Sequence, residues 1–151
     1  RAYDRNAAAS LYDIHVHAPL LLARGFADKR NNMGQGSSII FLSSAAALAK
    51  EAGLAAYGGA KAAIQAATIS LSRELAPQGI RINAVAPAMV RTPMSEQYFA
   101  MLSPDARDQA LAAYPLGIGT PEDVAQTIVF LLSDSGKWIT GQTVVMDGGR
   151  Y

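Results

Sequence analysis

Three side chains that could move a proton stand close together in the sequence. Tyr57 and Lys61 are four residues apart, and Ser44 precedes Tyr57 by thirteen residues. On a helix, a spacing of four places two side chains on one face. A tyrosine hydroxyl has an ordinary pKa of about 10, which is high for a general base near neutral pH, but a neighbouring ammonium lowers that pKa by favouring the phenolate. The three residues therefore predict a proton-transfer site in which Ser44 donates a hydrogen bond to a substrate carbonyl or alkoxide.

The same residues also have an ordinary structural explanation. A tyrosine on an alanine-rich helix commonly lies in the core, or at the surface with its hydroxyl in water. The pair Ser43-Ser44 at the end of a strand is common turn chemistry. The three residues hold no acceptor for electrons or hydride, so redox chemistry would need a bound cofactor. From these residues alone, a catalytic and a structural role both stay open.

The segments that must position these residues alternate between helices and strands. Helices are expected over residues 9–30, 56–76, about 104–112 and 120–132, with a kink at Pro19. Strands are expected over residues 38–43, 80–86 and 143–147. Residues 1–6 are expected to be loop or the end of an earlier helix, residues 45–55 a loop that can include a short helix, and most of residues 88–119 irregular. Short strands alternating with helices predict an α/β fold with a parallel sheet and right-handed crossovers.

Composition excludes several classes of function. The chain has 151 residues, 50% of them hydrophobic and 17% charged, with a net charge of +1. The chain has no run of basic residues that would indicate nucleic-acid binding, and no apolar stretch reaches the ~20 residues of a membrane span. The absence of Cys excludes disulfides and thiolate metal sites, and His15 and His17 could bind a metal only with carboxylate help. No signal-peptide pattern is present, so a cytoplasmic location is expected.

Four separated segments resemble the classical branch of the short-chain dehydrogenase/reductase family, in particular 3-oxoacyl-acyl-carrier-protein reductases. They are Ser44, the run Tyr57-Gly-Gly-Ala-Lys61, the run Gly79-Ile-Arg-Ile-Asn-Ala-Val-Ala-Pro87 followed by Thr92, and the run Gly141-Gln-Thr-Val-Val-Met-Asp-Gly-Gly149. Their order and spacing match the family from about residue 7 onward. The resemblance implies the C-terminal portion of a Rossmann-type, doubly wound parallel sheet with about three strands.

The resemblance also implies roles for individual residues. Tyr57 would be the general acid/base, Ser44 would polarise the substrate carbonyl, and Lys61 would lower the pKa of Tyr57 and bind the nicotinamide ribose. The reaction would interconvert a carbonyl and an alcohol by hydride transfer with NAD or NADP. The segment from Pro87 to Thr92 would wrap the nicotinamide, with the backbone of Val90 at the carboxamide. Residues 93–114 would form a substrate lid, and a homodimer or homotetramer is expected.

Two residues depart from the family pattern. His15 stands where the family usually has an asparagine that supports the catalytic lysine, so the resemblance implies that His15 belongs to the catalytic set. It either fills the asparagine position or weakens the proton relay. Ala88 stands where glycine is common after the proline, and alanine would be costly there if the position needs a positive φ.

The family's cofactor fingerprint, a glycine-rich turn after the first strand, is not found in the chain. Gly34-Gln-Gly36 precedes a strand, and Gly117-Ile-Gly119 precedes a helix, so both are interpreted as turns. Residues 1–151 are therefore expected to be the C-terminal, catalytic part of one NAD(P)-binding domain, inactive by itself. The alternative is a catalytically inert half-fold that acts as a self-association or interaction module.

Overall fold

A parallel three-stranded sheet organises the molecule. In a computed structural model, which describes residues 4–49 and 52–151, the strands are β1 (Ser38–Leu42), β2 (Arg81–Pro87) and β3 (Thr143–Met146). They lie in the order β1-β2-β3, with Ile39 beside Ile82 and Ala84 beside Thr143. All neighbouring strands are parallel, which confirms the predicted α/β architecture. β1 and β3 are the edges of this sheet.

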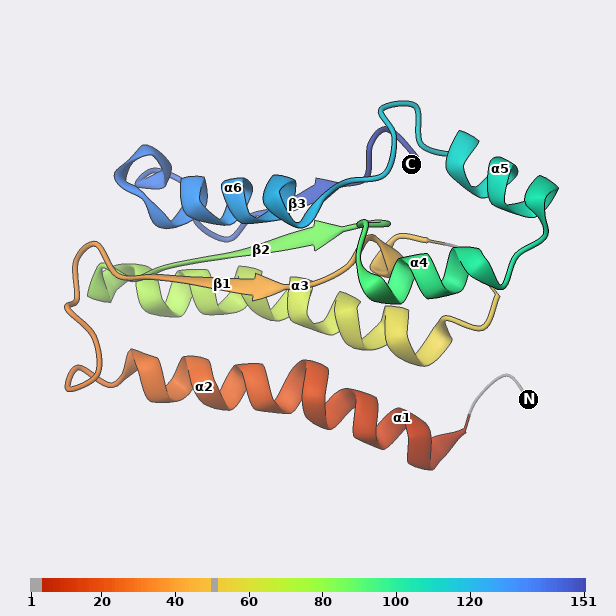
Figure 1. Cartoon of the computed structure of the whole chain (residues 1–151). Helices are drawn as coiled ribbons and strands as arrows, with labels where there is room; N and C mark the ends of the chain where they lie inside the picture. The colour runs from red at the N-terminus through yellow and green to blue at the C-terminus, as the bar shows by residue number, and fades with distance from the viewer. Residues whose placement is uncertain (1–3, 50–51) are drawn as a thin grey trace.

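Helices cover both faces of the sheet. They are α1 (Arg5–Tyr12), a π-helical turn (Asp13–His17), α2 (Ala18–Ala27), α3 (Ala55–Leu75), α4 (Pro93–Ala100), α5 (Pro104–Ala112) and α6 (Pro121–Leu132). Short 3-10 turns span Ala45–Ala47, Ala76–Gln78 and Asp134–Gly136. Helix α3 packs on β2 from one side, with α1 and α2 beside it, and α6 packs on β1 and β2 from the other side (Figure 1). None of the helices in the described ranges combines the length and apolar composition needed to cross a membrane.

The core is centred on β2. Residues Ile82 through Ala86 are fully buried, as expected for a central strand covered on both faces. On the α3 side, Phe41, Ile64 and Ile82 pack together with Ala23 of α2. The polar side chain of Asn83 is also fully buried, where its amide donates to the Ile139 carbonyl at 2.9 Å and its oxygen accepts from the Gln142 amide at 3.0 Å. Asn83 therefore joins β2 to the segment that leads into β3.

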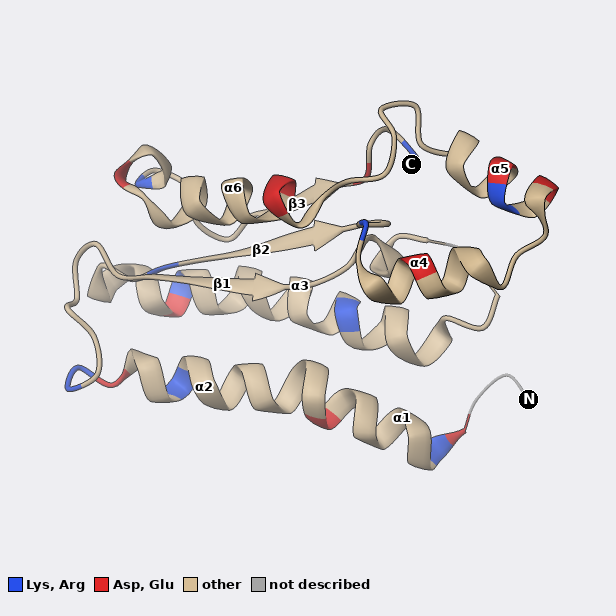
Figure 2. Cartoon of the chain, in the orientation of Figure 1, with Lys and Arg blue, Asp and Glu red and all other residues tan. Residues whose placement is uncertain are grey.

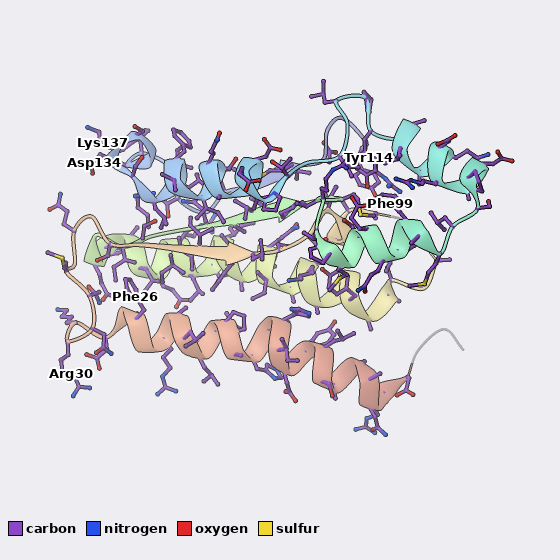
Figure 3. The ribbon with its side chains drawn as sticks, viewed as in Figure 1. Phe26, Arg30, Phe99, Tyr114, Asp134 and Lys137 are labelled. Atoms are coloured by element: carbon purple, nitrogen blue, oxygen red, sulfur yellow. The ribbon has the colours of Figure 1, made fainter. Side chains whose placement is uncertain are left out.

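The carboxyl ends of the strands share one end of the molecule with α4 and α5 (Figure 1). In parallel α/β sheets, ligands bind outside this end of the strands. Figure 3 shows Phe99 and Tyr114 at this end, while Arg30, Asp134 and Lys137 lie at the opposite end. Charged residues of both signs are scattered over helices and loops (Figure 2).

Several sequence-based expectations need correction. Helix α1 begins at Arg5 with Asp4 as its N-cap, so residues 5 and 6 open a helix and do not end an earlier one. Residues 1–3, and residues 50–51 of the expected loop 45–55, lie outside the described part. The irregularity expected at Pro19 takes the form of a π-helical turn just before it. Because proline lacks an N–H, it cannot make the ordinary helical bond to the residue four positions earlier. Residues 93–100, expected to be irregular, form α4 behind a capping box of Thr92 and Ser95.

The turn after α3 gives the first testable prediction. Gly79 has φ +76°, and a Cβ there would stand 2.6 Å from the Cα of Gln35. Gly79→Ala combines left-handed strain with a backbone clash and is expected to lower the free energy of unfolding by about 2–4 kcal/mol. Chemical denaturation measures this change. Gly25→Ala, which meets no atom within 4 Å, is the matched control, and equal stability of both variants would contradict the prediction.

Candidate functional site

Ser44 lies at the carboxyl end of β1, directly after the strand. Its backbone is extended, and its hydroxyl accepts a hydrogen bond from the Ala46 amide at 3.1 Å, which caps the turn Ala45–Ala47. The same hydroxyl donates to the Pro87 carbonyl at 3.4 Å, a long and therefore weak hydrogen bond. Only this weak bond holds the Ser44 proton, so the hydroxyl can rotate and donate to a substrate oxygen.

Tyr57 and Lys61 lie on one face of α3, as the spacing of four predicts. The Lys61 ammonium nitrogen is 5.7 Å from the centre of the Tyr57 ring. The Tyr57 hydroxyl has no hydrogen-bond partner among the described residues, so it is open to a ligand. A Cβ on Gly58 would stand 2.7 Å from the Ala46 carbonyl oxygen, which places the turn after Ser44 directly against the part of α3 that carries Tyr57. The structure therefore brings the three predicted residues to one place.

Lys61 is held in a low-polarity position. Its side chain is only 6% exposed, and Nζ donates to the Leu42 carbonyl oxygen at 2.8 Å. Burial lowers the pKa of Lys61 below its ordinary value, because the charged form loses contact with water. The backbone of β1 thus fixes the ammonium one helical turn from Tyr57.

His15 joins this group from the π-helical turn. Its ring meets the Tyr57 ring edge-on, with the centroids 5.5 Å apart and the planes at 82°. Partial burial, followed by the positive charge of Lys61, lowers the pKa of His15. His15 also shares with Lys61 the lining of a groove beside β1. π-helical turns often occur at functional sites, because the extra residue redirects side chains.

The predicted nicotinamide segment follows β2. The Gly119 amide donates to the Met89 carbonyl at 3.1 Å, and the Arg91 amide donates to the Gly119 carbonyl at 2.8 Å. These bonds pass on either side of Val90, whose own N–H and C=O have no partner among the described residues. A free donor and acceptor on one residue fit a carboxamide, which offers the complementary pair. The predicted role of Val90 is therefore compatible with the geometry.

The other residues of this segment have clear structural contacts. The Thr92 hydroxyl accepts from the Ser95 amide at 3.2 Å as the cap of α4, and the Pro87 carbonyl accepts from Ser44. Ala88 does not have the positive φ that would make alanine costly, since only glycines have positive φ in the described ranges. Its amide donates to the Met146 carbonyl at 2.9 Å. The departure from glycine at this position is thus accommodated without strain.

A small cavity opens at Ser44. It has a volume of about 160 Å³, and its walls come from the turn after Ser44, the segment after β2 and the end of the chain. The lining residues are Ser44, Ala45, Ala46, Ala49, Leu54, Ala88, Met89, Tyr114, Arg150 and Tyr151. Tyr114 belongs to the region predicted to form the substrate lid. The wall formed by Arg150 and Tyr151 was not expected, because no motif marks these residues.

The family follows from comparison with known proteins. The profile of the family described as Enoyl-(Acyl carrier protein) reductase matches residues 2–150. One relative, 36% identical over 140 residues, is the human dehydrogenase/reductase SDR family member 4, and it is matched over 91% of this chain and 49% of its own length. The chain belongs to the short-chain dehydrogenase/reductase family, as the four motifs indicated.

Other relatives agree on this family. The chain is 37% identical over 142 residues to the protein FixR of Bradyrhizobium diazoefficiens, covering 93% of this chain and 48% of that protein. It is 41% identical over 116 residues to the 3-oxoacyl-(acyl-carrier-protein) reductase FabG of Thermotoga maritima, covering 76% and 46%. The chain spans about half the length of the curated relatives it matches.

A solved structure confirms the fold. A 4-hydroxyisoleucine dehydrogenase complexed with NADH superposes with a TM-score of 0.88 at 29% sequence identity. The superposition covers 97% of this chain and 60% of that one. The three-stranded sheet and its helices are therefore a portion of a Rossmann-type fold, as the resemblance implied.

Proposed function

We propose that this chain is the catalytic part of an NAD(P)-dependent oxidoreductase that interconverts a carbonyl and an alcohol. The observation that carries the proposal is the convergence of Ser44, Tyr57 and Lys61 at the carboxyl end of β1, with the Tyr57 hydroxyl open to a ligand. The family suggests the chemistry of this arrangement, since its members include a 3-oxoacyl-(acyl-carrier-protein) reductase and a similar structure is a dehydrogenase complexed with NADH.

Each residue has a distinct task in this reaction. Ser44 donates a hydrogen bond to the carbonyl oxygen, which gains negative charge in the transition state. Tyr57 donates the proton to this oxygen during reduction and removes it during oxidation. The ammonium of Lys61 stabilises the phenolate that forms on Tyr57, and its fixed bond to Leu42 means that little reorganisation is needed.

The segment after β2 would hold the nicotinamide end of the cofactor. When bound, the nicotinamide supplies or accepts the hydride. The free N–H and C=O of Val90 support a role for this residue in binding the carboxamide. Pro87 and Thr92, at either end of the same segment, would bracket this contact, and Lys61 would hydrogen-bond the ribose.

The glycine-rich part of the cofactor site would come from a further segment that extends the sheet at β1. A groove of about 620 Å³ runs along this edge between β1 and α2, lined mostly by apolar side chains. Leu42 is 59% exposed there, and the buried Ser38 hydroxyl has no partner in the described part of the chain. An open edge and an orphaned hydroxyl both fit the addition of another strand.

A hydride-transfer assay tests the proposed function. The native protein that carries this chain is mixed with NADH or NADPH and a panel of ketones that includes ethyl acetoacetate, and loss of nicotinamide absorbance is recorded. Turnover that requires the Tyr57 hydroxyl is the expected result. Turnover that is unchanged in a Tyr57→Phe variant would contradict the assignment of the acid/base residue.

The pH dependence of stability tests the environment of His15. Because the pKa of His15 is lowered in the folded protein, the unfolded chain binds this proton more tightly. Above the ordinary histidine pKa of about 6.5, His15 is neutral in both the folded and the unfolded chain and its protonation does not change stability. As the pH falls through that value toward the lowered pKa, the unfolded chain binds the proton first, and this destabilises the fold. The unfolding free energy of His15→Asn is therefore expected to fall less than that of the wild type between about pH 8 and about pH 5.

The matched control is His17→Asn, which changes an exposed histidine on the same π-helical turn. Urea denaturation at each pH gives the free energies. If His15→Asn lost stability with falling pH as steeply as the wild type, burial and the charge of Lys61 would not disfavour the charged form of His15, and the lowered pKa would be contradicted.

A further inference from the structure

We propose that Gln65 is a positioning residue that fixes Ser44 relative to Tyr57 and Lys61. Gln65 lies on α3 one helical turn beyond Lys61, and no motif in the sequence marks it. The inference rests on the proposed function, because it concerns the same serine.

The contacts of Gln65 all lead to the serine pair after β1. Its amide nitrogen Nε2 donates to the Ser43 hydroxyl at 3.0 Å and to the Ser44 carbonyl oxygen at 3.4 Å. The Ser43 hydroxyl in turn donates to the Lys61 carbonyl oxygen at 2.9 Å. A hydroxyl has one proton, and Ser43 uses it toward Lys61, so Ser43 must accept from Gln65. This direction agrees with the amide group of Gln65 acting as the donor.

The hydrogen bonds from Gln65 to Ser43 and Ser44 would be difficult to replace. Ser43 is only 3% exposed, so water cannot easily replace Gln65 as its hydrogen-bond partner. Ser44 itself has few restraints after the strand. Its hydroxyl bonds Ala46 and, weakly, Pro87, and its carbonyl accepts from the Ala47 amide at 3.1 Å. Gln65 adds a side-chain hydrogen bond from α3, the helix that carries Tyr57 and Lys61, to the Ser44 backbone itself.

A small displacement of Ser44 has a large effect on rate. Hydrogen bonds to the developing oxyanion depend on a preorganised distance, and a misplacement of about 1 Å can cost on the order of a hundredfold. Loss of the Gln65 hydrogen bonds leaves the other hydrogen bonds of Ser44 in place, so Ser44 is expected to move by less than this distance. Substitution of Gln65 should therefore lower kcat about tenfold.

Kinetics of the Gln65→Met variant test the inference in the native protein, with ethyl acetoacetate and a nicotinamide cofactor. Methionine keeps the length of the side chain and removes the donor. We expect kcat to fall about tenfold while KM for the cofactor stays near its wild-type value, and the melting temperature should fall because buried Ser43 loses a donor. Gln126→Met, the same change at an exposed position of α6, should leave kcat unaltered. A lower melting temperature with an unchanged kcat would show that Gln65 has a purely structural role and would overturn the inference.

A double-mutant cycle locates the effect at Ser44. In a Ser44→Ala background there is no hydroxyl to position, so Gln65→Met should cause little additional loss of kcat. A full tenfold loss in that background would overturn the inference. If Gln65→Met leaves kcat unchanged while Tyr57→Phe abolishes turnover, the inference fails and the proposed function stands.

Hydrogen exchange provides a readout that does not depend on turnover. The amides of Ala46 and Ala47 bond to the hydroxyl and the carbonyl of Ser44. Their exchange should accelerate several-fold in Gln65→Met and stay the same in Gln126→Met. Unchanged exchange in Gln65→Met would overturn the inference even if the proposed function itself proved wrong.

Discussion

Replacing Tyr57 with phenylalanine is expected to lower kcat for carbonyl reduction about a thousandfold, which corresponds to about 4 kcal/mol of transition-state stabilisation. The hydroxyl is the proposed proton donor to the carbonyl oxygen. The Ser44 hydroxyl is an ordinary alcohol, which is too weak an acid to replace the Tyr57 hydroxyl as the proton donor. Steady-state measurement of nicotinamide absorbance with ethyl acetoacetate gives kcat and KM.

The structure predicts that this variant stays folded. The Tyr57 hydroxyl makes no hydrogen bond within the described ranges, so its removal leaves no buried group unpaired. The ring itself, which packs edge-on against His15, is kept. Tyr12→Phe, at the end of α1, is the matched control and should keep wild-type turnover. Equal activities of the two variants would refute the role of Tyr57 as the acid/base.

Replacing Lys61 with methionine is expected to lower kcat about a hundredfold, because the phenolate of Tyr57 loses its neighbouring positive charge. Methionine fills a similar volume in this buried position. The Leu42 carbonyl loses its donor, which costs about 1–3 kcal/mol where no other donor replaces it. The melting temperature is therefore expected to fall as well.

The pH profile distinguishes this electrostatic role from a packing role. Burial lowers the pKa of Lys61, so its ammonium is lost at a less alkaline pH than that of a free lysine. Above the lowered pKa the stabilisation of the phenolate disappears, and the difference in kcat between wild type and Lys61→Met should shrink as the pH rises through it. Lys137→Met, an exposed lysine at the opposite end of the molecule (Figure 3), is the control. A pH-independent difference would contradict the electrostatic role.

Much of the fold could be predicted from periodicity and end signals. The apolar run of residues 38–43 predicted a strand covered on both faces, and the structure has this strand as β1, at an edge, with Leu42 59% exposed. Helix α6 was clear from its Thr120-Pro121 start. Helix α4 was missed although Thr92-Pro93 is the same kind of start. Only Ser95 and Phe99 of α4 are buried, so its sequence has little of the periodicity that marks a packed helix.

The candidate site was predictable where one element holds two residues, and much less so where separate elements meet. The spacing of Tyr57 and Lys61 on α3 follows from helix geometry alone. The contact of His15 with the Tyr57 ring depends on a π-helical turn and on the packing of that turn against α3. Gln65 carried no signal, since a glutamine on a helix is ordinarily at the surface.

The amino-acid sequence by itself determined the family, the order of the strands and the candidate residues for proton transfer. These properties depend on residue types and local spacing, which the chain carries directly. Only the tertiary structure decided that Lys61 is buried against the Leu42 carbonyl, that Val90 keeps a free donor and acceptor, and that Gln65 reaches the serine pair. Such contacts join segments far apart in the chain, and they form only when the sheet and its helices pack together.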